Sequence, residues 1–395
     1  MSYKFDVSVI LVNYNGKKYI DNLFASLVKI KHDDFSYEVI FEDNHSTDDS
    51  VEYLRNSEYA TKCNLKIVES EENLGFAGGN NLGVENAEGK YIILLNNDTA
   101  VDENWLSEIY HFIVEHPECG MVNSKLVFFY DFMKVTFTTK DKVVIKRTIR
   151  INGEDYKIDN KFCKNALCHE KEVVCFGHTE IDIPLLTGVG DYTVKMNIKE
   201  FDEGASVTIA GKVSEAKNKL SVALDEKIVE DNKYTLIQNA GSGINENYDG
   251  YDIGFCEPDG EKFSEPYEIN NGCGASIIML KEDFEKCGKF DEKFFMYYED
   301  TDLSYRIKKL GKKIMYCPTS LVRHIHTGSS SEWSPFFVYH VYRNKLLFIK
   351  KNISTKKYIK FFLKQCKQAV KEKSKMKLRG TFASLKVILG MNAHF

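Results

Sequence analysis

Two carboxamides and one carboxylate stand where a buried strand is expected to end. Asn96-Asn97-Asp98 directly follows the apolar run Tyr91–Leu95. Parallel strands of an open α/β sheet end at the edge where ligands bind, so these side chains are candidates for holding a charged group. Asn and Asp are also common in plain turns, because their side chains bond to the local backbone. The stretch by itself leaves both interpretations open.

A second group of carboxylates follows a run of aromatic residues. Directly after the segment Phe294–Tyr298 come Glu299, Asp300 and Asp302, and a helix is expected to start at about Thr301. Carboxylates at a helix N-terminus are stabilised by the helix dipole, which needs no catalytic role. Aromatic crowding, in contrast, desolvates a carboxylate and raises its proton affinity, as a general base working near neutral pH requires.

Two histidines, His324 and His326, follow this acidic group in an extended segment. A lone histidine is usually a structural residue. A pair that comes after an acidic cluster, in a chain with another carboxylate at a strand end, is a better candidate for binding a metal ion or a phosphate.

A further set of cysteines and histidines resembles a zinc site only superficially. Structural zinc sites usually contain tighter pairs with two to four residues between the cysteines. The spacing here favours buried or incidental thiols. The set comprises Cys163, Cys168, His169, Cys175 and His178.

The composition restricts the class of protein. A chain of 395 residues is long enough for two or three domains. An apolar share of 43% supports real cores, and a net charge of −5 argues against nucleic acid as a partner. No apolar run approaches the ~18 residues of a membrane span, and no signal peptide is recognisable, so a cytoplasmic location is expected.

Strands and helices alternate in the first third of the chain, which predicts a mostly parallel sheet with helices on both faces. Each expected strand ends in polar or glycine residues, so one edge of this sheet should bind a ligand. A helix is expected from about Asn80 to Ala87, and Ser46 or Thr47 is expected to cap another. The expected strands are Val7–Asn13, Tyr37–Glu42, Leu65–Glu69 and Tyr91–Leu95.

The pattern changes at about Lys134, where alternation of apolar and polar residues replaces the helical period. In Asp191–Phe201, for example, every second residue is apolar. Further strands are expected at Val173–Ile183, Ser206–Val213 and Leu220–Val229. We therefore expect residues 134–232 to form an inserted all-β module, resembling a small sandwich. Residues 1–133 and 233–345 then form the α/β domain.

The remaining residues, 346–395, are expected to form a basic helical tail. Between Lys351 and Arg379 there are eleven Lys or Arg residues and one Glu, with Tyr358, Phe361 and other apolar residues between them. A basic amphipathic helix is typical of a membrane-surface element, and peripheral attachment at the inner face of the membrane is one interpretation. The other is a basic helix that packs on the acidic catalytic domain.

Seven motifs, in this order, resemble those of family 2 glycosyltransferases, and most closely the rhamnosyltransferase-like branch. The resemblance covers Val7–Tyr130 and Tyr234–Asn344 but not the β module. The motifs are VSVILVNYNG, EDNHSTDDS, ENLGFAGGNNLG, LLNNDT, GCGAS, FDEKFFMYYEDTDL and the His-Gly-Ser segment that begins at His326.

The resemblance implies a GT-A fold whose first part, residues 1–133, binds a nucleotide-sugar. Val12 and Tyr14 match positions at the nucleotide, with Tyr14 bordering the base, and Asp43 matches the residue that accepts from the imide N–H of uracil or thymine. UDP- or dTDP-sugars, dTDP-rhamnose among them, are therefore the implied donors. Asn73 and Gly79 match the loop beside the nucleotide, where a missing side chain permits close approach.

The resemblance also implies a metal site and a general base. Asn97 matches a ribose contact, and Asp98 matches the member of the family's DxD motif that ligates Mg²⁺ or Mn²⁺, although Asn96 replaces the first acidic residue. His324 matches a histidine that completes the site, with His326 as the alternative. In the second part, residues 233–345, Asp300 matches the catalytic base of an inverting transfer, and Glu299 supports it or binds the acceptor.

The implied acceptor is a hydroxyl of a cell-surface glycan or of a lipid-linked saccharide. Two other functions remain open. A sugar-1-phosphate nucleotidyltransferase would need a more basic, glycine-rich first loop than Asn13–Lys17 provides. A glycan-binding scaffold would use the β module on an inactive transferase.

Overall fold

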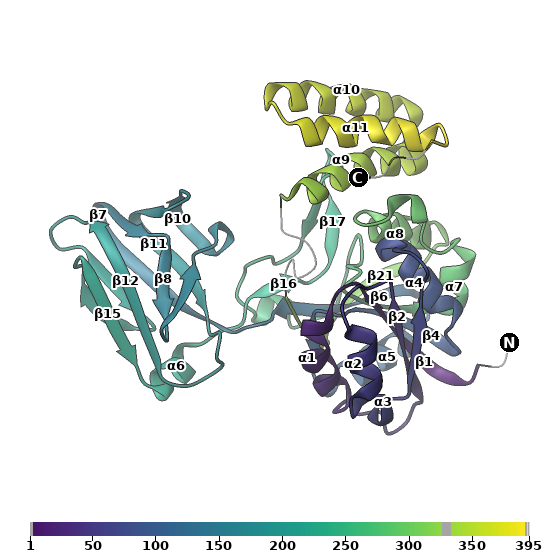
Figure 1. Cartoon of the computed structure of the whole chain (residues 1–395), viewed down its shortest axis with the longest axis horizontal. Helices are drawn as coiled ribbons and strands as arrows, with labels where there is room; N and C mark the ends of the chain where they lie inside the picture. Colours follow the sequence, from purple (N-terminus) through teal and green to yellow (C-terminus); the bar gives the residue numbers. More distant parts are fainter. Residues whose placement is uncertain (1–2, 326–332, 392, 394) are drawn as a thin grey trace. The chain divides into compact units, whose positions relative to one another are not determined.

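The computed structural model describes residues 3–325, 333–391, 393 and 395. The chain forms two compact units (Figure 1). The first unit comprises Met1–Phe129, Gln238–Phe255 and Gly260–Phe395, and the second comprises Tyr130–Ile237 and Cys256–Asp259. The second unit contains the expected module, with ends a few residues outside 134–232.

A ten-stranded mixed sheet forms the centre of the first unit, in the order β19-β21-β6-β20-β4-β1-β2-β3, with β5 on β21 and β16 on β6. Strands β3, β2, β1 and β4 are parallel, whereas β20 runs antiparallel to β4 and β6. The strands are β1 (Phe5–Asn13), β2 (Tyr37–Asp43), β3 (Leu65–Glu69), β4 (Gly89–Asn96), β5 (Thr99–Val101), β6 (Cys119–Phe128), β16 (Ile237–Asn239), β19 (Tyr267–Glu268), β20 (Ser276–Leu280) and β21 (Lys313–His324).

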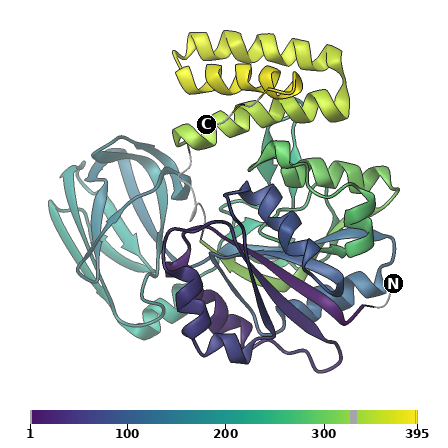
Figure 2. The same cartoon turned by 45° about the vertical axis from the view of Figure 1, so that its right-hand side comes forward.

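Helices cover both faces of this sheet, as Figures 1 and 2 show. One face packs on α1 (Lys17–Leu27), α2 (Ser50–Asn56) and α5 (Trp105–Glu115), where Phe24 and Trp105 are fully buried. The other face packs on α4 (Gly75–Glu85), α7 (Lys281–Lys286) and α8 (Glu299–Lys309). Short α3 (Tyr59–Lys62) follows α2. The continuous β-branched runs form the central strands because both of their faces are covered. The α/β fold class expected from the sequence is confirmed.

Three helix starts differ from expectation. Helix α4 begins at Gly75, five residues early, and α8 begins at Glu299 rather than Thr301. Neither Ser46 nor Thr47 caps α2, which begins at Ser50. The Ser46 hydroxyl instead accepts from Asn13 Nδ2 and from the Asn15 N–H.

The second unit is a nine-stranded antiparallel network around one hydrophobic core. The expected alternation in β12 holds, since Tyr192, Val194, Met196 and Ile198 are buried. The strands are β7 (Phe132–Lys146), β8 (Thr148–Ile151), β9 (Glu154–Lys157), β10 (Cys163–Cys168), β11 (Glu172–Pro184), β12 (Tyr192–Glu200), β13 (Ser206–Ile209), β14 (Lys212–Glu215) and β15 (Lys219–Leu224).

Two expected strands of this unit are interrupted. The segment 206–213 turns at Ala210-Gly211, where both residues have positive φ, and so forms the hairpin β13–β14. The segment 220–229 leaves β15 at Leu224 and enters α6 (Glu226–Asn232), because Asp225 caps this helix by accepting from the Ile228 N–H at 2.8 Å. The described residues contain no group of three or more His, Cys, Asp or Glu side chains placed to hold a metal ion.

The described C-terminal residues form three helices, α9 (Pro335–Phe348), α10 (Thr355–Lys371) and α11 (Lys375–Ile388). A π-helical turn (Ile349–Ile353) joins α9 to α10. Tyr358 and Phe361 pack in a hydrophobic cluster with Phe294 and Phe348. A helical tail is therefore confirmed, but these two aromatic side chains are buried and do not face solvent. No helix in the described part of the chain is long and apolar enough to span a membrane.

The β module should be removable. Phe132 and Tyr234 exchange backbone hydrogen bonds of 2.8 and 3.0 Å, so the two ends of the module are adjacent. Because closing such a gap costs little loop entropy, replacing residues 134–232 with a short linker should leave a soluble chain that unfolds cooperatively on heating. Circular dichroism and gel filtration measure this. If the deletion product is insoluble while an isolated 130–237 fragment folds, the rest of the chain needs the module in order to fold, and the prediction is wrong.

Candidate active site

Hydrogen bonds link the carboxyl ends of three neighbouring strands. Asn97, after β4, donates from Nδ2 to Asn13 Oδ1 at the end of β1 at 2.9 Å. Asn13 in turn donates to Asp43 Oδ1 at the end of β2, also at 2.9 Å. The strands are parallel and in register, with Asn13 opposite Asp43, so their ends meet at one edge of the sheet. This edge carries the polar side chains that the sequence singled out.

Asp43 is held rigidly at this edge. Its Oδ2 accepts from the Ser46 N–H at 3.0 Å while Oδ1 accepts from Asn13, and the residue is only 4% exposed. Each carboxylate oxygen has a second lone pair, so the group can still accept from a ligand. Tyr14, which follows Asn13 in the chain, has half of its surface exposed. Val12 is half-buried on β1.

The loop before α4 is fixed by Asn44 rather than by its glycines. The Asn44 side chain donates to Gly75 O at 3.0 Å and to Asn73 Oδ1 at 3.2 Å, and accepts from the Leu74 N–H at 2.8 Å. Gly79 lies inside α4, where a Cβ would come within 2.9 Å of Val12 Cγ1. The absence of a side chain at Gly79 therefore lets α4 pack close to the sheet. This role is separate from the close approach of a ligand that the sequence predicts at this glycine.

Asp98 and His324 are in contact although 226 residues separate them. His324 Nε2 lies 3.1 Å from Asp98 Oδ1 and 3.3 Å from Asn96 Nδ2. The contact forms because β21 pairs with β5, which places His324 opposite Thr99. Asp98 and His324 offer one oxygen and one nitrogen to a cation. His326 lies outside the described residues.

Gln238 orients the histidine, a role that the sequence did not reveal. Its Oε1 lies 2.6 Å from His324 Nδ1. An Nδ1–H that donates to this oxygen leaves the Nε2 lone pair directed toward Asp98, which is the arrangement of a metal-binding histidine. Gln238 follows the β module, and no motif marks it.

Asp300 and Glu299 stand side by side at the start of α8 but in different surroundings. Asp300 accepts from the Gly274 N–H at 3.2 Å and from the Thr301 N–H at 2.6 Å. Burial raises the pKa of Asp300, and these two backbone bonds oppose the rise. Glu299 is 5% exposed and its Oε2 has no hydrogen-bond partner among the described residues, so burial holds its pKa well above the usual range.

The loop that precedes these carboxylates is strained and held from α9. Phe295, Tyr297 and Tyr298 all have φ between 63° and 71°, which costs about 1–3 kcal/mol for each such residue. Asn344 Nδ2 lies within 2.8 Å of the carbonyl oxygens of residues 294, 296 and 297. Arg343 donates to the Phe294 carbonyl at 2.7 Å. These bonds compensate for the strain and fix the direction of the chain into α8.

One pocket of about 650 Å³ brings these groups together. Asp98, His324, Glu299 and Asp300 all line it. The expected nucleotide residues Val12, Tyr14, Asp43, Asn73, Gly79 and Asn97 do not line it. The other lining residues are Phe76, Asn96, Leu126, Gln238, Asn239, Ser242, Gly250, Tyr251, Asp252, Phe255, Cys273, Gly274, Ala275, Met296, Tyr297 and Phe337.

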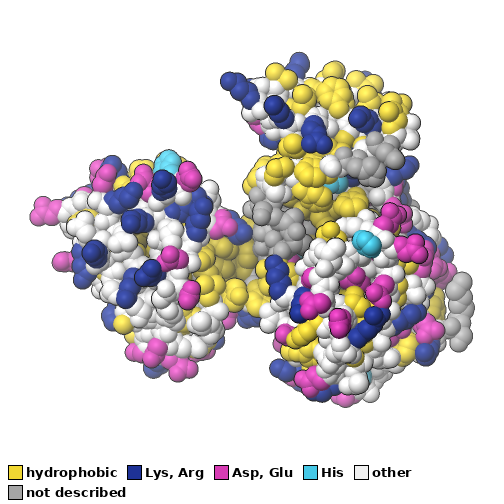
Figure 3. All heavy atoms as spheres, in the orientation of Figure 1, with side chains coloured by type: hydrophobic (Ala, Val, Ile, Leu, Met, Phe, Trp, Pro, Cys, Tyr) yellow, Lys and Arg dark blue, Asp and Glu magenta, His cyan; other side chains and the backbone are white. Residues whose placement is uncertain are grey.

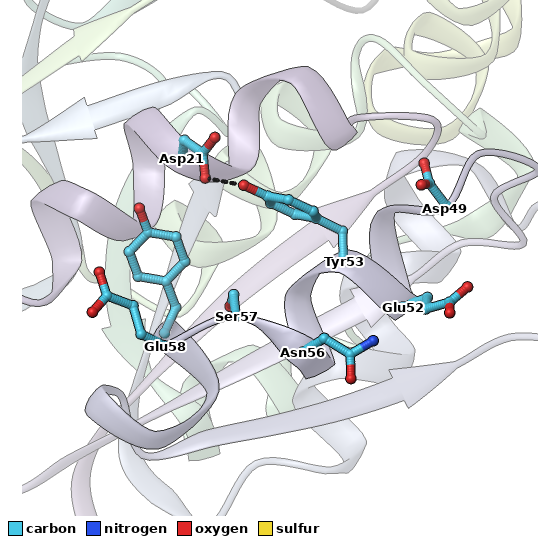
Figure 4. Close-up of a pocket in the computed structure, with 8 residues that line it drawn as sticks. Asp21, Asp49, Glu52, Tyr53, Asn56, Ser57 and Glu58 are labelled. Atoms are coloured by element: carbon cyan, nitrogen blue, oxygen red, sulfur yellow. Dashed lines mark hydrogen bonds between the residues drawn. The ribbon is translucent and has the colours of Figure 1, made fainter.

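A separate hollow of the first unit, lined by α1, α2 and α3, is a poor ligand site. Figure 4 shows Asp21, Asp49, Glu52 and Glu58 around it, with the Tyr53 hydroxyl donating to Asp21 at 2.7 Å. Asp49 is already paired with Lys17. An acidic hollow without the strand ends described above would repel an anionic ligand.

Residues 8–173 match the family model described as glycosyl transferase family 2. The chain is 34% identical over 110 residues to the poly(ribitol-phosphate) β-N-acetylglucosaminyltransferase TarS of Staphylococcus aureus, covering 28% of this chain and 19% of TarS. It is 31% identical over 109 residues to the putative teichuronic acid biosynthesis glycosyltransferase TuaG of Bacillus subtilis, covering 28% and 42%.

It is 37% identical over 62 residues to the N-acetylglucosaminyl-diphospho-decaprenol L-rhamnosyltransferase of Mycobacterium tuberculosis, covering 16% of this chain and 20% of that protein. The chain thus spans less than half the length of each of these relatives. Among solved structures, it is similar to GalNAc-T7 with UDP, GalNAc and Mn²⁺, with a TM-score of 0.49 at 16% identity over 87% of this chain and 50% of that one.

Glu42 should make stability depend on pH. It is fully buried, its two oxygens have no hydrogen-bond partner among the described residues, and burial raises its pKa from 4.5 to about 8, with a smaller contribution from Asp43. Between these pH values the folded state keeps a proton that the unfolded state releases, so stability falls as pH rises.

Glu42→Gln removes this titration. Urea unfolding should show the variant and the native chain to be similar at pH 5. At pH 8 the variant should gain roughly 2–4 kcal/mol relative to the native chain. Glu52→Gln, on the exposed side of α2, is the matched control and should show no such difference. A constant difference between Glu42→Gln and the native chain at the two pH values would reject the buried titration.

Proposed function

This chain belongs to glycosyl transferase family 2 through residues 8–173, and on this premise we propose that it is an inverting transferase. It moves a sugar from a UDP- or dTDP-sugar to a hydroxyl of a cell-surface glycan or a lipid-linked saccharide. The observation that carries the proposal is that Asp98 and His324, from β4–β5 and β21, share one pocket with Asp300 of α8. A cation-binding pair and a base thus face the same space.

The charge of the pocket supports a divalent cation. None of the described residues that line it is Lys or Arg. A sugar donor brings a diphosphate, whose charge a bound Mg²⁺ or Mn²⁺ neutralises as the leaving group departs. Asp98 and His324 would hold this ion, and the imidazole favours Mn²⁺ of the two because Mg²⁺ prefers oxygen ligands.

Asp300 is the proposed base because it lines the pocket that Asp98 and His324 share and because its carboxyl group is buried. Burial raises its pKa, which suits proton transfer, while two backbone N–H groups keep the anion accessible. It takes the acceptor's hydroxyl proton as the oxygen bonds to the anomeric carbon and the bond to the nucleotide diphosphate breaks. Glu299, whose pKa burial raises well above its usual range, lines the same pocket beside Asp300 and would support it or bind the acceptor.

The two alternative functions are less well supported. A nucleotidyltransferase needs free basic groups for a triphosphate, but Lys17, the basic residue of the first loop, is paired with Asp49 at 2.6 Å. A non-enzymatic scaffold would not need the contact between Asp98 and His324. Product analysis separates all three: the transferase releases UDP or dTDP, the nucleotidyltransferase releases pyrophosphate, and the scaffold releases neither.

Asp300→Asn should retain donor binding and lose transfer. The amide keeps the shape of the carboxylate but accepts no proton, so kcat should fall by about 10²–10⁴. Steady-state kinetics with UDP- and dTDP-sugars measures this, and fluorescence titration with UDP checks binding. The control Asp21→Asn, at the hollow of Figure 4, should keep full activity. Near-native turnover by Asp300→Asn would exclude it as the base.

The C-terminal helices support attachment to an anionic membrane surface. Residues 346–395 contain thirteen Lys or Arg and one acidic residue, Glu372. Figure 3 shows these cations beside apolar side chains on α10 and α11. Exposed apolar residues recur at helical spacing on both helices: Ile359, Leu363 and Val370, then Phe382, Leu385 and Leu389. Such attachment would bring a lipid-linked acceptor within reach.

The full chain should therefore sediment with vesicles that contain phosphatidylglycerol and not with pure phosphatidylcholine. Each cation near an anionic leaflet contributes about 1 kcal/mol, so salt should weaken the binding. The double variant Leu363→Glu, Phe382→Glu should release the protein, whereas Leu167→Glu, an equally exposed leucine of the β module, should not. If the native chain stays in the supernatant at low salt, the attachment is rejected.

A further inference from the structure

The pocket contains a carboxylate, Asp252, that none of the roles above uses. We propose that Asp252, with the aromatic residues Tyr251 and Phe337, binds the acceptor, and that the accepting unit is an uncharged pyranose rather than a polyol phosphate. This inference rests on the proposed transferase function and specifies its acceptor.

Asp252 is held by one of its two oxygens. The hairpin β17 (Ser242–Ile244) and β18 (Gly250–Asp252) places it opposite Ser242. Oδ1 accepts from Asn239 Nδ2 at 2.7 Å and from Ser242 Oγ at 2.8 Å. Among the described residues nothing donates to Oδ2. A carboxylate fixed in this way presents one free oxygen to a ligand hydroxyl, with which it forms a strong, charge-assisted hydrogen bond.

Aromatic side chains line the same pocket as Asp252, among them Tyr251, Tyr297 and Phe337. Tyr251 is 47% exposed, and its ring lies over Gly243, where a Cβ would come within 2.6 Å of the ring. The Tyr297 and Phe337 rings are 5.0 Å apart, and Trp333, 71% exposed, lies 5.9 Å from Phe337. Rings of this kind pair an apolar face with a polar edge, as the two sides of a sugar ring require.

The charges of the pocket exclude an anionic accepting unit. Asp252 and Asp300 both line this pocket, and the charge of Asp252 raises the pKa of Asp300. No Lys or Arg among the described lining residues offsets them. The charge of a bound cation is already balanced by the donor diphosphate, so a phosphate next to the reacting hydroxyl would be repelled. A neutral sugar with adjacent hydroxyls suits both the carboxylates and the rings.

Saturation-transfer NMR on the full chain with UDP and Mg²⁺, which is diamagnetic and leaves the ligand signals sharp, tests the inference. The probes are the methyl glycosides of glucose, galactose, N-acetylglucosamine and rhamnose, with ribitol 5-phosphate as the anionic comparison. At least one glycoside should show transfer, and ribitol 5-phosphate should show none. Asp252→Asn and, as a second variant, Tyr251→Ala should each weaken the glycoside at least tenfold. Asp155→Asn in the β module should leave it unchanged.

Two properties of the Asp252 variant serve as internal controls. The thermal unfolding midpoint should stay within about 2 °C, because the substitution leaves the core intact. The affinity for UDP with the cation should change by roughly twofold at most, because Asp252 is not one of the residues proposed to hold the cation, although its charge interacts with that of His324. Binding of ribitol 5-phosphate, silence of every glycoside, or native glycoside affinity in both variants would overturn the inference while UDP still binds. Loss of UDP binding by the native chain would instead overturn the proposed function itself.

Discussion

The pairing of β21 with β5 and β6 is the constraint on which the site depends. It places His324 opposite Thr99 and within 3.1 Å of Asp98, so that two residues 226 positions apart in the chain meet at one sheet edge. Gln238 then fixes the imidazole from a third segment. Because all three segments belong to one hydrogen-bonded sheet, their geometry is set by the backbone and does not require a ligand to assemble it.

The segment that leads into Asp300 has a strained backbone, and hydrogen bonds from α9 compensate for this strain. Phe295, Tyr297 and Tyr298 adopt left-handed backbone conformations that Asn344 and Arg343 hold through carbonyl contacts. Asp302, one turn into α8, is fully buried and bonds to Lys351 at 3.0 Å and Asn352 at 2.7 Å. The C-terminal helices thus position the base and also carry the basic and apolar surface. The same C-terminal segment therefore links the proposed base to the proposed membrane-binding surface.

The sequence predicted what local patterns determine. The four parallel strands appear where expected because burial on both faces produces a continuous apolar run in the sequence. The alternation of β12 appears where expected because burial on one face makes every second residue apolar. Asp98, His324 and Asp300 could be singled out because they follow strands or aromatic runs. Gln238, Asn344 and Asp252 could not, because their roles come from pairings between distant segments and no local pattern records these. The hairpin at Ala210-Gly211 and the cap at Asp225 interrupt expected strands because a positive φ at two successive residues and a single side-chain cap leave the apolar alternation of the sequence unchanged.

We propose that Asp98 and His324 hold the cation to which a nucleotide diphosphate binds. Titration calorimetry of UDP in the presence and absence of Mn²⁺ tests it most directly. The native chain should bind UDP with Mn²⁺ at least tenfold more tightly than without, and Asp98→Ala and His324→Ala should each remove this difference while leaving the unfolding temperature nearly unchanged. Equal UDP affinity with and without Mn²⁺ in the native chain, or a Mn²⁺ effect that survives both substitutions, would contradict the account.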